Sequence, residues 1–116
     1  MIQNGIIINS DLNITNGFLD CSITIKLEGA WEQKLESGSL YLPETYINHN
    51  IRSFAGYWIY NIMKIAGVNR WNEVVGKSIR VSNTPYKIDG IGHIIESIWF
   101  YPDIDFNEED VEDANK

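Results

Sequence analysis

The stretch LDCSITIKLE, Leu19–Glu28, decides the fold of this chain. Its apolar side chains alternate strictly with polar or charged ones, at Leu19, Cys21, Ile23, Ile25 and Leu27. A period of two predicts a β-strand with one face on the core and the other in water. Cys21 is therefore expected to point inward, away from the cationic, partly exposed setting that a reactive cysteine needs.

The residues on either side predict two partner strands. Asn16-Gly17 is a two-residue hairpin signal, and the short apolar run Ile6–Ile8 precedes it. The stretch GAWEQKLESGSLYLPETYINHN, residues 29–50, follows. It predicts a third strand that ESGS interrupts, and then a loop that contains His49.

The second half of the chain predicts two helices and three more strands. Residues 52–66 form one amphipathic helix, with Ser53 as its N-cap and Gly67 just past its end. A short helix around Trp71 follows, and then the strands SIRVSN, KIDGIGHII and IWFYP. In the second of these, Gly90 and Gly92 indicate a bulge or a close backbone approach.

The element order is therefore βββααβββ, which indicates an α+β fold. We expect a mostly antiparallel sheet of about five to six strands, with one main helix and one short helix packed on one face. Residues 1–102 are predicted to form this single domain. Residues 103–116 are predicted to be an acidic tail.

Composition narrows the classes of function. The chain has 116 residues, 44% hydrophobic and 22% charged, as is usual for one globular domain. The net charge is −7, of which the tail carries −6, so the domain itself is nearly neutral. A nearly neutral domain with an acidic tail argues against binding to duplex nucleic acid. One cysteine, no signal peptide and no long apolar span predict a cytoplasmic protein without a membrane segment.

Little in the sequence favours catalysis. The tail matches a calcium loop only at its first positions, the cysteine and the two histidines cannot close a zinc site, and no P-loop is present. We expect no catalytic residue, metal or cofactor. An enzyme would need His93 beside Asp89 or Glu96, and the even spacing of Asp89 and His93 would put both on one strand face.

Aromatic and arginine side chains are the candidate binding residues. Large aromatics in a small domain are usually core, and the alternative is that some line an interface or a pocket. His93 is expected on a strand face with Ile91 and Ile95, donating a hydrogen bond to a backbone carbonyl in a structural role. The candidates for contact with a ligand or partner are Trp31, Trp58, Arg70, Trp71, Arg80, His93 and Trp99.

The segments GVNRWNEVVGKSIRV and IDGIGHIIESIWFYP resemble a family of small proteins encoded by phages and prophages. The opening NGIIINSDLNITNGFLDCSITIKLEG is similar to the first hairpin of that family. Gln33 matches a glutamine of the family, but the glycine-rich FGG segment expected after the second strand is missing.

The resemblance implies a non-enzymatic anti-defence protein in the cytoplasm of a bacterial host. It would bind and inhibit a component of bacterial immunity, as anti-CRISPR proteins do. One alternative is a sponge that sequesters a nucleotide immune signal, as anti-Thoeris and anti-CBASS proteins do, with Arg70 or Arg80 beside Trp71 or Trp99. Another is a phage accessory protein with no immune role. A homodimer through an edge strand, such as Leu40–Leu42, is a further expectation.

Overall fold

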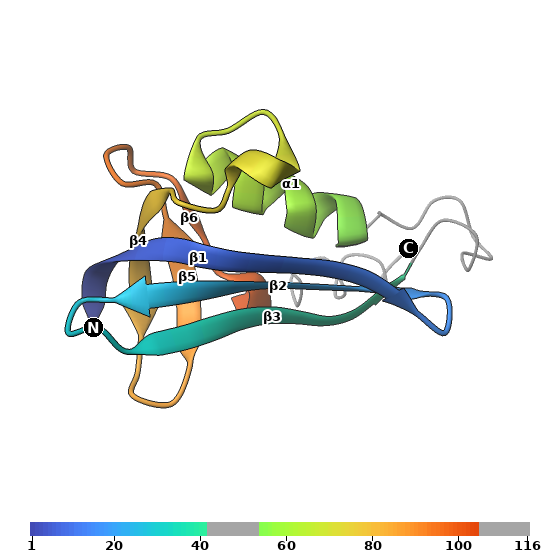
Figure 1. Ribbon diagram of the computed structural model, residues 1–116, viewed down its shortest axis with the longest axis horizontal. Coiled ribbons are helices and arrows are strands. Elements are labelled where there is room, and N and C mark those ends of the chain that lie inside the picture. Colours follow the sequence, from blue (N-terminus) through green and yellow to red (C-terminus); the bar gives the residue numbers. More distant parts are fainter. Residues whose placement is uncertain (42–53, 105–116) are drawn as a thin grey trace.

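The computed structural model describes residues 1–41 and 54–104 of the chain (Figure 1). Ser53, the loop around His49 and the tail from residue 105 onward lie outside these residues. The described part is an α+β fold, which confirms the predicted class and element order. Its elements are β1 (Ile2–Thr15), β2 (Phe18–Leu27), β3 (Glu32–Tyr41), α1 (Phe54–Ala66), η2 (Trp71–Glu73), β4 (Ser78–Asn83), β5 (Ile88–Gly92) and β6 (Trp99–Phe100).

The strands form one antiparallel sheet in the order β3-β2-β1-β4-β5-β6. The central strand β1 pairs with β2 from Gly5 to Thr15, but with β4 only from Ile2 to Ile6. Among the described residues, β1 is therefore the one strand that joins the β2–β3 half of the sheet to the β4–β6 half.

The first strand is much longer than the apolar run Ile6–Ile8 predicted. It continues through polar residues to Thr15, because the turn after it fixes the register of the hairpin. Asn16 and Gly17 have φ values of 54° and 81°, as a tight turn with both central residues left-handed requires. This turn places Thr15 opposite Phe18, and the antiparallel pairing continues from there to Gly5 opposite Leu27.

The alternation that decides the fold appears in β2 as predicted. Its apolar members Leu19, Cys21, Ile23, Ile25 and Leu27 are all buried. The predicted break at ESGS is wrong, since β3 runs through it. The register between β2 and β3 shifts beside this segment, and Gly38 adopts a φ of 68°, so the extra residue is taken up as a bulge.

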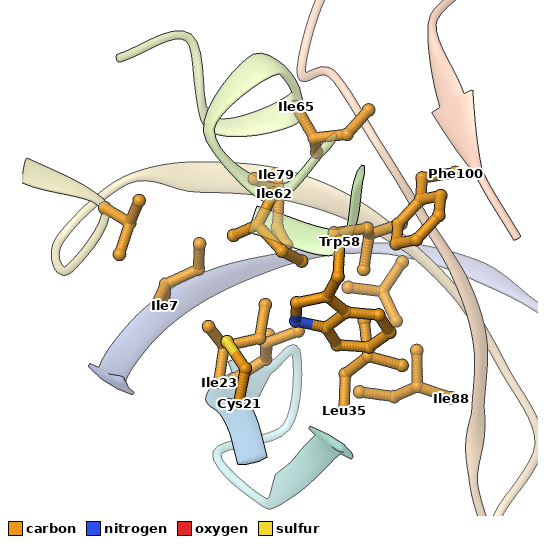
Figure 2. Close-up of a cluster of buried hydrophobic side chains, with 14 of the residues drawn as sticks. Ile7, Cys21, Ile23, Leu35, Trp58, Ile62, Ile65, Ile79, Ile88 and Phe100 are labelled. Atoms are coloured by element: carbon orange, nitrogen blue, oxygen red, sulfur yellow. The ribbon is translucent and has the colours of Figure 1, made fainter. Parts of the chain in front are cut away.

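Helix α1 covers one face of the sheet, which we call the inner face (Figure 1). Figure 2 shows the Trp58 ring pointing from α1 into the core, among Leu35, Ile88 and Phe100. The Trp58 and Phe100 rings meet edge to face at 5.4 Å. Burying each large apolar side chain of this kind contributes about 1.5–3 kcal/mol, so the α1 contact is a main source of stability.

The end of α1 lies at Gly67, as predicted. Its N–H donates to Met63 O at 2.8 Å and its φ is 74°, the left-handed geometry that ends many helices. The predicted second helix is only the three-residue 3₁₀ helix η2. No helix in the described residues is long and apolar enough to cross a membrane.

The sheet is strongly curved, so that β3 lies close to the β4–β5 turn. Asn83, only 2% exposed, donates from Nδ2 to Gln33 Oε1 at 2.8 Å and accepts at Oδ1 from Gln3 Nε2 at 3.1 Å. Gln33 Nε2 also donates to Thr84 O at 3.0 Å. Because β2 and β1 separate β3 from β4 in the sheet, these bonds stabilise its curvature.

The start of the predicted tail is tied to the domain. The Asp103 carboxylate lies 3.0 Å from Lys87 Nζ in the β4–β5 turn, and both side chains are exposed. Residues 102–104 form a helical turn.

Candidate protein-binding surface

Three of the predicted site residues come together at the β5–β6 loop. Arg80 of β4 donates from Nε to His93 O at 2.7 Å and from Nη2 to Glu96 O at 2.6 Å. Its guanidinium carbon also lies 4.9 Å from the centre of the Trp99 ring. Arg80 therefore ties the start and the middle of the loop to the sheet and also contacts the Trp99 ring.

His93 has a structural role, but not the predicted one. Strand β5 ends at Gly92, and Ile95 is 82% exposed, so these residues do not continue a strand face with Ile91. His93 Nδ1 accepts hydrogen bonds from the backbone N–H groups of Ile95 and Glu96, at 3.1 and 3.0 Å. Accepting at Nδ1 requires a lone pair on that nitrogen, so His93 is an acceptor in this turn and not the predicted donor to a carbonyl. The predicted shared strand face of Asp89 and His93 is absent, because His93 lies beyond the strand.

The other predicted site residues are separate from this cluster. Trp58 is 1% exposed in the core, so its prediction as a contact residue is wrong. Trp71 of η2 is half-buried and packs against the core. Trp31 is exposed in the β2–β3 turn, and Arg70 is exposed just before η2. The count of tryptophans in the sequence does not tell which of them are buried: Trp58 is in the core, whereas Trp31 is exposed in a turn.

Two glycines explain the position of the aromatic rings. A Cβ added at Gly92 would come within 2.6 Å of the Trp99 ring, and one at Gly90 within 2.6 Å of the Tyr101 ring. The predicted close approach at Gly90 and Gly92 is thus confirmed, with the two rings as the groups that approach. The rings stack on one another at 5.8 Å with an interplanar angle of 20°.

The rings lie on the outer face of the sheet, opposite α1. Strand register places Ile6 beside Ser78, and Arg80 between Asn4 and Gly92. A hollow of about 480 Å³ borders this row, with Ile6, Ser78 and Ile94 among its lining residues. We call the outer-face patch the set Ile2, Ile6, Arg80, Ile94, Trp99 and Tyr101.

The outer-face patch leaves apolar surface in water. Ile2 is 62% exposed and Ile6 is 46% exposed, while Ile94, Trp99 and Tyr101 are half-buried. Ile6, Ile94 and Tyr101 were not singled out from the sequence. Their proximity follows from the strand order, which places the first strand beside the fourth and brings the β5–β6 loop alongside.

Neither a metal cluster nor a reactive cysteine is found among the described residues. They contain no group of three histidine, cysteine or acidic side chains that could hold a metal ion. Burial raises the pKa of the Cys21 thiol to about 11, although a hydrogen bond with the Trp58 side chain lowers it in part. A protonated thiol facing the indole in the core is a poor nucleophile (Figure 2).

Comparison of the chain with protein-family models, with curated proteins and with solved structures found no match. The function must therefore be inferred from the residues and their geometry.

Proposed function

We propose that the protein acts by binding, and that it docks a component of bacterial immunity on the outer-face patch and inhibits it. The observation that carries this proposal is a partly apolar and aromatic surface on the sheet face opposite α1, which no helix or strand of the described residues covers. Ile6 is 46% exposed on a strand whose other face packs on the core, and contiguous apolar surface that stays in water in this way marks interaction sites.

The composition of the patch suits a protein partner. Tryptophan, tyrosine and arginine supply most of the energetic anchors of protein interfaces, and the patch has one of each, with the Trp99 ring in contact with both the Arg80 guanidinium and the Tyr101 ring. The hydrogen bonds of Arg80 and of His93 Nδ1 already order the β5–β6 loop in the free protein. Little conformational entropy is therefore lost when a partner docks. The hollow beside Ile6 and Ile94 offers space for a partner side chain.

The resemblance to small phage and prophage proteins supplies the setting. A protein of this kind would work in the cytoplasm of a bacterial host, where the immune machinery is. The acidic tail would assist by meeting a basic surface of the partner, since seven acids and one lysine follow Pro102.

A plating experiment tests the proposal. Bacterial strains that each carry one defence system would express the protein and be challenged with phage. We expect restored plaque formation on at least one strain, and loss of this effect with Ile6→Glu, which buries a charge in the interface. Tyr60→Glu is the matched control, because Tyr60 is 59% exposed on α1, the layer on the opposite side of the sheet.

Two results would contradict the proposal. One is normal defence in every strain that expresses the intact protein. The other is equal inhibition by the wild type and Ile6→Glu, with both folded by circular dichroism, because the patch would then have no part in the effect. If only the yield of phage particles changed, the accessory role would be the better account.

A nucleotide sponge is the second candidate, and the contact of Arg80 with Trp99 favours it. A base could stack on the aromatic pair, and a phosphate could meet the guanidinium. Two of the Arg80 nitrogens already donate to loop carbonyls, which leaves fewer donors for phosphate. Thermal unfolding with a panel of cyclic and linear nucleotides tests this role: a ligand at 100 times its dissociation constant stabilises by about 2.7 kcal/mol. No shift with any of them would rule the sponge out.

A further inference from the structure

The outer half of β1 has an open edge. Strand β4 pairs with β1 only up to Ile6, and the last bonds on that side join Ile7 to Gly76 and Lys77. From Ile8 to Thr15, β1 has β2 on one side and no paired strand on the other among the described residues. An unpaired strand edge is a template for another strand.

The hairpin turn determines which residues face this edge. In a hairpin with a two-residue turn, the flanking residues Thr15 and Phe18 bond to each other, and bonded and non-bonded pairs alternate from there. The register is continuous from Thr15 back to Asn9. Ser10, Leu12 and Ile14 therefore direct their N–H and C=O groups away from β2 and toward the open edge.

The side chains along this edge block it only weakly: the one charge in the stretch is Asp11, and the bulge of β1 lies at its start, between Ile7 and Asn9. Leu12 is 42% exposed and Ile14 is 67% exposed, and the stretch Ile8–Thr15 contains no lysine, arginine or proline. The opposite edge of the sheet, on β3, differs: it carries Glu32, Lys34 and Glu36, which are exposed, and a bulge at Gly38. Charges and bulges are the usual protection of an edge strand, so β3, with three charges and a bulge within its length, is better protected than the Ser10–Thr15 segment of β1, which has one charge and no bulge.

We propose that two copies of this chain pair through the open edge of β1, antiparallel and centred on Leu12. In this register Leu12 meets Leu12 of the second copy, and Ser10 meets Ile14. The residues whose backbone groups point outward are then the bonded pairs, as an antiparallel ladder requires. The homodimer expected from sequence thus forms on β1, and not on the β3 edge at Leu40–Leu42.

The length of the ladder and the existing pairing of β1 favour this register over its neighbours, and no like charges stand opposite each other in it. On the outer face, Asp11 stands opposite Asn13 of the second copy, so a carboxylate meets an amide. Centring the pair on Ser10 would bring Ile14 against Ile6, which already pairs with Ser78 of β4. Centring it on Ile14 would place Leu12 against Asn16 in the turn and shorten the ladder.

The dimer would be weak and would join the two binding surfaces. Pairing one short strand segment buries less area than a stable dimer needs, so the monomer and dimer should interconvert with concentration. The two-fold axis of an antiparallel pair stands perpendicular to the sheet, so both outer-face patches would lie on one side of a continuous sheet. This inference does not depend on the proposed function, because it concerns the edge and not the patch.

Sedimentation of the full-length protein over a wide concentration range tests the pairing. We expect a reversible rise from 13.3 kDa toward twice that mass. Leu12→Lys should keep the protein monomeric at concentrations where the wild type is mainly dimeric. Tyr86→Lys is the matched control, because Tyr86 is 93% exposed in the β4–β5 turn, and it should dimerise like the wild type. A wild type that stays monomeric at the highest concentration, or a dimer that Leu12→Lys leaves intact, would overturn the proposal.

Cross-linking tests the register separately. In the proposed dimer, the two Leu12 Cα atoms lie about 5.5 Å apart, within the range for a disulfide. Leu12→Cys should therefore form a covalent dimer on oxidation. Ile14→Cys should not, because the two Ile14 positions are offset by about 13 Å along the strands. Both variants need Cys21→Ala, since Cys21 is the β2 partner of Leu12 and would capture the new thiol. Equal cross-linking of the two variants would refute the Leu12-centred register.

Discussion

Replacing Arg80 with alanine should destabilise the fold by about 2.5–3 kcal/mol and release the β5–β6 loop. The substitution removes the two hydrogen bonds to His93 O and Glu96 O, at 2.7 and 2.6 Å, and the contact with the Trp99 ring at 4.9 Å. The turn that His93 Nδ1 stabilises would then no longer be hydrogen-bonded to β4 through Arg80.

The magnitude follows from these contacts. A hydrogen bond from a charged donor contributes about 1.5–3 kcal/mol, and the half-buried position of Arg80 calls for the lower end or less, about 1 kcal/mol each. A cation over an aromatic ring at a partly exposed site adds about 0.5–1 kcal/mol. These contacts sum to about 2.5–3 kcal/mol, which should appear as a lower urea midpoint with an unchanged slope.

Arg70→Ala is the matched control, because it makes the same chemical change at an exposed arginine before η2. Its cost should stay within about 0.5 kcal/mol. Hydrogen exchange adds a local measure: the Ile95 and Glu96 amides, which donate to His93 Nδ1, should exchange faster in Arg80→Ala alone. If both alanine variants unfolded at the same urea concentration, the assigned role of Arg80 would be refuted.

Three further predictions concern other parts of the fold. Gly92→Ala adds a Cβ within 2.6 Å of the Trp99 ring and should cost about 1–3 kcal/mol in urea unfolding; an unchanged midpoint would show that the ring moves freely. Because burial raises the pKa of Cys21 from 9.0 to about 11, the unfolded thiol ionises first as pH rises. Its contribution to stability should be complete below pH 9.0 and be lost up to about pH 11, and Cys21→Ala should lack this component of the pH dependence measured by urea unfolding. Asn83→Ala leaves the Gln33 and Gln3 amides without their buried partner and should cost about 1–3 kcal/mol; a cost near zero would mean that water takes the place of Asn83.

The fold could be predicted to a large extent because its signals are local. The alternation from Leu19 to Leu27, the Asn16-Gly17 turn and the glycine after α1 each act within a few residues. The predictions failed where a neighbour decides the outcome. The polar half of β1 is a strand because β2 holds it in register, and the ESGS segment of β3 remains in the sheet because a bulge absorbs the extra residue.

The candidate site could be predicted only in part. Arg80, His93 and Trp99 were selected for their residue types, and they do meet. Ile6 and Ile94 carry no signal of their own, because they become neighbours only when β4 pairs with β1. The role of His93 could not be predicted either, because a histidine that accepts hydrogen bonds from the amides two and three residues further on looks, in sequence, like any histidine near a strand end.

The position of β1 has a kinetic consequence. The β1–β2 and β2–β3 pairs form between neighbouring segments, whereas Gly5 must find Ile79 across most of the chain. Closing such a long loop is entropically costly, so the β1–β4 ladder should be the slow step of folding. The same seam should open first in the native state, and the three-stranded meander and the β4–β6 unit would then exchange their amides as two cooperative groups.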